Sequence, residues 1–164
     1  MSRHRCRADR PAPPALDWAL AEPLREADIA EYVAHYVDGP GHRPNDYDWY
    51  FHPAVPLAAL RALESGTGPS DDSPAGWRQW LRRERDVFRA ENDLSEFDDG
   101  PWGDDFAEWL TTGGLWERDA AVVATEQGGA RPGFGIHDGN HRVATAHERG
   151  MATLRGYLGI RRQP

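Results

Sequence analysis

The segment 136–142 (Ile-His-Asp-Gly-Asn-His-Arg) contains the residues of this chain that are best suited to hold an anion. Its pattern predicts the end of a strand, a turn at Gly139 and the start of a helix. The amides at a helix start and the helix dipole attract negative charge, and glycine lets the backbone approach a ligand closely. His141 and Arg142 fall in the first turn, where Arg142 can bind two oxygens of one anion. We therefore predict a phosphate site.

Arginine supplies all 19 positively charged side chains, because the chain contains no lysine. This excludes a P-loop lysine, a Schiff base with a cofactor aldehyde and a Ser-Lys dyad. Arginine stays charged, so it cannot replace lysine as a nucleophile or proton carrier. A bound phosphate or carboxylate must be held by arginine, histidine, backbone amides or a metal ion.

The formal net charge of −8 is concentrated in one segment. Residues 84–108 hold ten acidic side chains and two arginines, a local charge of −8, and the rest of the chain sums to zero. From His141 onward, five arginines face one acid. Because nucleic-acid affinity depends on neutralising phosphates, an acidic chain disfavours nucleic acid as a partner and favours a small anion.

The single cysteine, Cys6, cannot form an internal disulfide, which favours a reducing compartment. No apolar run approaches the ~18 residues of a membrane span, and the first 14 residues lack the apolar middle of a secretion signal. We predict a cytoplasmic protein without membrane contact. Residues 1–15, rich in arginine and proline, are predicted to be a disordered arm.

The remaining patterns predict one α/β (α+β) domain over residues 16–164, a small mixed sheet with packed helices. A helical N-terminal extension, interrupted by Pro23, precedes the sheet, and a helical, acidic insertion lies at about 65–105. A short strand followed by a helical turn is predicted within 46–63, further strands at 120–125, 134–137 and 153–160, and helices at 77–88 and 141–149.

The order strand, Asp-Gly-x-His-Arg box, helix, glycine, strand resembles the ParB/sulfiredoxin superfamily. The resemblance covers residues 105–160, and Val55-Pro56-Leu57 resembles the opening strand of that family. Asn140 stands where sulfiredoxins carry a catalytic cysteine, which argues against peroxiredoxin repair. Partition proteins have a Gly-Glu-Arg-Arg box followed by a helix-turn-helix domain, so with the sequence ending at Pro164 we do not expect a complete partition protein.

The box is closer to family members that act on small molecules, including a free-serine kinase group, while other members are called nucleases. The resemblance implies that four residues bind the phosphates of a nucleoside triphosphate, ATP or CTP: Gly139, Asn140, His141 and Arg142. It also implies that Asp138 positions Mg2+ or a substrate hydroxyl. The expected function is phosphoryl transfer to a small molecule, or NTP hydrolysis.

Two glutamates are candidates for a metal ligand or a base, Glu117 before the strand at 120–125 and Glu126 after it. The sequence does not choose between them, although Asp138, His141 and Glu117 form the set of catalytic residues that we expect.

Three alternatives remain open at this stage. In the first, the chain is a ParB-like nuclease or nucleic-acid binder that uses its N-terminal arm and C-terminal arginines. In the second, it is a non-catalytic ligand-binding module. In the third, the box is a structural turn in which Arg142 pairs with an acid from residues 84–108 and His141 is only hydrogen-bonded. The acids at 98, 99, 104 and 105 are expected to form a solvated loop rather than a cation site, because they lack the alternation of an EF-hand.

Overall fold

A six-stranded mixed sheet forms the centre of the computed structural model, which describes residues 16–37, 42–63, 68–91, 121–128 and 132–163. The strand order is β1-β2-β6-β4-β5-β3. β4 lies parallel to β6 and β3 parallel to β5, and the other neighbours are antiparallel. The strands are β1 (Glu22–Pro23), β2 (Tyr47–Pro56), β3 (Leu60–Ala62), β4 (Val122–Gln127), β5 (Gly133–Asp138) and β6 (Thr153–Arg161).

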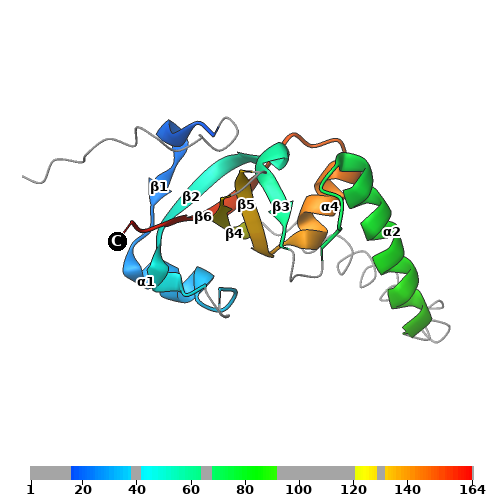
Figure 1. Cartoon of the computed structure of the whole chain (residues 1–164), viewed down its shortest axis with the longest axis horizontal. Coiled ribbons are helices and arrows are strands. Elements are labelled where there is room, and N and C mark those ends of the chain that lie inside the picture. The colour runs from blue at the N-terminus through cyan, green and yellow to red at the C-terminus, as the bar shows by residue number, and fades with distance from the viewer. Residues whose placement is uncertain (1–15, 38–41, 64–67, 92–120, 129–131, 164) are drawn as a thin grey trace, which may run out of the picture.

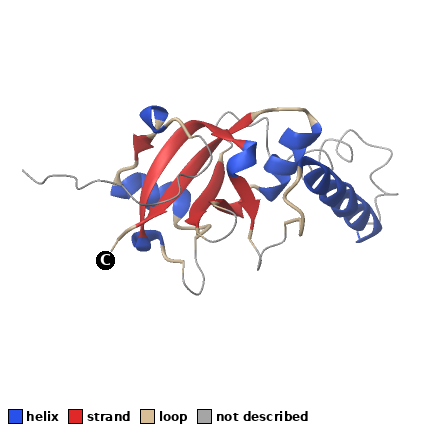
Figure 2. Ribbon diagram, turned by 45° about the horizontal axis from the view of Figure 1, so that its top comes forward, coloured by secondary structure: helices blue, strands red, loops and turns tan. Residues whose placement is uncertain are grey.

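Three α-helices accompany the sheet in the described part of the chain: α1 (Glu26–Asp28), α2 (Pro74–Glu91) and α4 (Asn140–Glu148). α1 continues into a π-helical turn, Ile29–Val33, and 3₁₀ turns occupy Trp18–Leu20, Pro44–Asp46 and Leu57–Ala59. Figure 2 shows the strands as one curved sheet with the long helix α2 at one end. The predicted mixed α/β class is therefore confirmed.

The N-terminal extension is less helical than its apolar spacing predicted. Its first part forms a 3₁₀ turn and then the short edge strand β1, which contains Pro23 and pairs with β2. Proline has no N–H to donate, so it is tolerated in an edge strand but not inside a helix. The α-helix begins only after Pro23, at Glu26.

Alternation along the strands sends side chains to two separate cores. Val122 and Ala124 of β4 face the larger core, which also contains Trp77 and Leu81 of α2. α4 lies between the sheet and α2 (Figure 1) and contributes Val143, Ala144 and Ala146 to this core. This face of the sheet is thus covered by two helices, α2 and α4.

The opposite face is covered by the N-terminal helical turns. Val33, Tyr47, Trp49 and Val123 are buried there together. Trp49 lies on Gly159 of β6, where a Cβ would come within 3.0 Å of the indole. Burial of these apolar rings fixes the N-terminal segment onto the sheet.

Most predicted elements agree with the structure within a few residues, namely α2, α4, β4, β5 and β6. The predicted short strand after residue 46 is longer, because β2 spans 10 residues with an irregularity between His52 and Val55. The arm at 1–15 and the segment 92–120, which includes most of the acidic residues and Glu117, lie outside the described residues. Within the described ranges, no helix has the length and apolar character needed to cross a membrane.

Candidate functional site at the junction of β5 and α4

The junction of β5 and α4 depends on Gly139. This residue has φ of +103°, a left-handed conformation that side chains rarely adopt. A Cβ at Gly139 would lie 2.9 Å from Cγ1 of Val122 on the neighbouring strand. Glycine therefore allows both the turn and the close approach of α4 to β4.

α4 begins at Asn140, and the residue before it, Gly139, has no side chain that could cap the helix. The first N–H groups of a helix have no carbonyl within the helix to bond, and the helix dipole makes this end positive. The amides at the start of α4 are the groups that the sequence predicted would hold an anion, and this stays a prediction.

Arg142 connects the two sides of this turn. Its Nη1 donates a hydrogen bond of 2.9 Å to Oδ2 of Asp138 and one of 2.7 Å to the carbonyl oxygen of Ala121. Both side chains of the ion pair are partly exposed. Asp138 is therefore occupied by an arginine, and a cation at its carboxylate must compete with Arg142.

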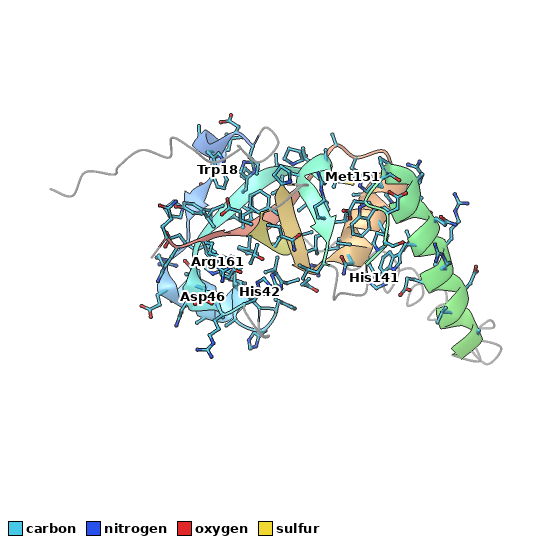
Figure 3. The ribbon with its side chains drawn as sticks, viewed as in Figure 1. Trp18, His42, Asp46, His141, Met151 and Arg161 are labelled. Atoms are coloured by element: carbon cyan, nitrogen blue, oxygen red, sulfur yellow. The ribbon has the colours of Figure 1, made fainter. Side chains whose placement is uncertain are left out.

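His141 lies between α4 and α2 (Figure 3). Its ring centroid is 4.9 Å from that of Trp80, and its Nε2 is 3.7 Å from a carboxylate oxygen of Glu84. Burial lowers the pKa of His141, although Glu84 and Asp138 act in the opposite direction. The ring is consequently neutral near pH 7.

In the alternative in which the box is only a structural turn, Arg142 was expected to pair with an acid of the 84–108 segment. Among the described residues, Arg142 pairs with Asp138, and Glu84, an acid of the 84–108 segment, lies near His141. The acidic segment therefore contributes to the surroundings of the site through α2.

Asn140 has a buried side-chain oxygen, Oδ1, that accepts no hydrogen bond from the described residues. This atom would lie 3.2 Å from a Cβ at Gly68, in the loop that follows β3. A buried acceptor without a donor costs free energy, so this position suits a water or a ligand hydroxyl.

The structure describes only one of the two candidate glutamates. Glu117 lies outside the described residues. Glu126 pairs with Phe134 at the far end of β5, whereas Asp138 pairs with Val123 near the start of β4. At about 3.3 Å per residue this places Glu126 roughly 10 Å along the strand from the box. Across the ranges that the structure describes, no group of three or more His, Cys, Asp or Glu side chains could hold a metal ion.

A second polar cluster lies on the opposite side of β5 and was not predicted. The rings of His42 and His137 are 5.1 Å apart, centroid to centroid. Each ring also contacts a hydroxyl, that of Tyr47 for His42 and that of Thr125 for His137. His42 and His137 are far apart in the sequence, so no spacing pattern could have indicated this cluster.

Comparison with protein-family models, with curated proteins and with solved structures finds no match to this chain. The junction brings together helix amides, a neutral histidine, an arginine and a carboxylate that is paired with the arginine. This combination can hold an anion and accept a proton, which are the requirements of phosphoryl transfer.

Proposed function

We propose that this protein is a nucleotide-binding enzyme with a ParB/sulfiredoxin-like fold. It binds a nucleoside triphosphate, ATP or CTP, together with Mg2+, and either transfers a phosphoryl group from the nucleotide to a small-molecule substrate or hydrolyses the nucleotide with water. The single observation that carries this proposal is the uncapped start of α4 after the left-handed Gly139.

The phosphate oxygens accept hydrogen bonds from the first amides of α4. Arg142 exchanges Asp138 for a phosphate oxygen, because the two anions compete for the same guanidinium group. The exchange releases the carboxylate of Asp138 beside the bound phosphates. There it can hold Mg2+ or orient a substrate hydroxyl, so anion binding and assembly of the site are coupled.

His141 has the properties of a general base. Its lowered pKa keeps the imidazole neutral and able to accept a proton from an attacking hydroxyl. Arg142 and the helix amides offset the charge that develops on the phosphoryl oxygens, and an Mg2+ held by Asp138 would add to this stabilisation. The arrangement thus needs no lysine.

The order of elements also supports the family assignment within this proposal. β4, β5, α4 and β6 follow one another as the resemblance implies, with the box between β5 and α4. Nucleic acid is less well supported as a ligand. Arg162, one of the C-terminal arginines, is paired with Asp48 at 2.9 Å, and the chain has a net charge of −8.

A nucleotide panel tests the proposal directly. ATP, CTP and GTP are titrated into the full chain by calorimetry with and without Mg2+, and products are followed by phosphorus NMR. We expect saturable binding of at least one nucleotide and at least a tenfold weaker affinity in Arg142→Ala. Arg149→Ala, at the other end of the same helix, is the matched control. Binding that survives Arg142→Ala, or no binding at all, would contradict the proposal, and binding without product would identify a non-catalytic module.

A further inference from the structure

The cluster of His42 and His137 is a built site on the sheet face opposite to α4. Thr125 and Tyr47, whose hydroxyls contact the two rings, are 0 and 1% exposed. β4 pairs Ala124 with Ile136 and Val123 with Asp138, so His137 is the extra residue of a β-bulge. Bulges redirect side chains, often at functional sites.

Each imidazole has one nitrogen engaged and one available. His42 Nδ1 is 2.7 Å from the Tyr47 hydroxyl, and His137 Nε2 is 2.8 Å from the Thr125 hydroxyl. Among the described residues, neither His42 Nε2 nor His137 Nδ1 has a hydrogen-bond partner. A histidine that ligates a metal characteristically has its other nitrogen oriented by a hydrogen bond, and here both rings meet this condition.

The separation of the rings fits coordination of one ion. With metal–nitrogen bonds of about 2.0–2.1 Å and a tetrahedral angle, two coordinating imidazoles have centroids about 5.2 Å apart. The observed separation is 5.1 Å. We propose that His42 and His137 together bind one divalent transition-metal ion, such as Zn2+, Ni2+ or Cu2+, through His42 Nε2 and His137 Nδ1.

No third His, Cys, Asp or Glu among the described residues completes the group. Imidazole ligands favour these metals over Mg2+, which distinguishes this site from that of the proposed nucleotide function and makes it independent of that proposal.

The test is calorimetric titration of Ni2+ and Zn2+ into the chelator-treated full chain without a histidine tag. We expect one ion per chain, and at least tenfold weaker binding in His42→Ala and in His137→Ala. His35→Ala, which removes an exposed histidine, is the control and should leave the affinity unchanged. Thr125→Val keeps both ligands but releases the ring of His137, so we expect a smaller loss.

A measurement on the unaltered protein guards against variants that fail to fold. Substoichiometric Cu2+ should broaden the imidazole NMR signals of His42 and His137 before those of the other histidines. Absence of one-to-one binding, affinity unchanged in both alanine variants, or broadening confined to other histidines would show that the two rings are only packed against each other, and would overturn the proposal.

Discussion

Arg142 donates a hydrogen bond of 2.9 Å to the carboxylate of Asp138, four residues earlier and across the turn at Gly139. The pair holds a positive and a negative group at the same helix start. An incoming anion is attracted by the guanidinium group of Arg142 and repelled by the carboxylate of Asp138. In the proposed function, Asp138 therefore restrains anion binding in the ligand-free protein, and this restraint can be measured.

Asp138→Asn should tighten binding of nucleotide in the absence of Mg2+ and abolish turnover. The substitution keeps the shape of the side chain but removes the competing charge, and an exposed ion pair is worth up to about 1 kcal/mol, or roughly fivefold in affinity. Calorimetry with ATP or CTP measures the change. Weaker binding in Asp138→Asn would show that the carboxylate does not compete with the ligand.

Gly139→Ala should destabilise the fold and displace α4. The left-handed φ is strained for alanine, and the new Cβ would meet Val122, so we expect a loss of about 2–3 kcal/mol in the free energy of unfolding. Gly150→Ala is the matched control, because Gly150 also has a positive φ but no atom within 4 Å of a Cβ. Its cost should be about 1 kcal/mol. Urea unfolding of both variants measures the difference, and equal losses would argue against a close contact at Val122.

The ion pair between Arg85 of α2 and Glu148 of α4 should couple the two helices weakly. Its Nη1–Oε1 distance is 2.7 Å, and both side chains are about one-third exposed. A double-mutant cycle with Arg85→Ala and Glu148→Ala should give a coupling energy below about 1 kcal/mol that decreases with salt. Arg85 lowers the pKa of Glu148 through a hydrogen bond, so this stabilisation is present above the unfolded-state pKa and is lost as pH falls through the folded-state value. A coupling that is insensitive to pH between 3 and 7 would contradict this account.

His147 should make the fold less stable in mild acid. Burial lowers its pKa, and Arg78 adds to the effect, so the unfolded chain takes up a proton more readily than the folded protein does. The contribution to stability is complete above the unfolded-state value of about 6.5 and declines as pH falls below it. His147→Phe keeps a ring against Trp77, whose centroid is 6.3 Å from that of the histidine. Thermal unfolding from pH 8 to 5 should give a flatter pH dependence for this variant, and an unchanged slope would exclude His147 as a contributor.

The sequence predicted the local structure of the β5–α4 junction better than the contacts around it. The turn at Gly139 and the helix from Asn140 are local features, because one glycine and the apolar spacing after it determine them. The acidic partner of Arg142 could not be predicted from the sequence, because an acid four residues away and an acid on another helix can both form an ion pair with an arginine. Among the described residues, Arg142 pairs with the local acid, Asp138.

Contacts between distant segments could not be read from the sequence. His42 and His137 meet only because a bulge in β5 turns one ring toward a loop from the other end of the chain. In the same way, Glu126 appeared to be a candidate from its place after a predicted strand, yet the antiparallel register moves it away from the box. Register and bulges depend on pairing between strands, which a single sequence does not specify.

The proposed function requires that an anion binds at the start of α4. The most direct test is a titration of isotope-labelled protein with pyrophosphate, followed through the backbone amide resonances of Asn140 and His141. Our account predicts that these two resonances shift together and saturably, and that the shifts disappear in Arg142→Ala. Saturable shifts that spare both amides, or no shifts at any concentration, would contradict it.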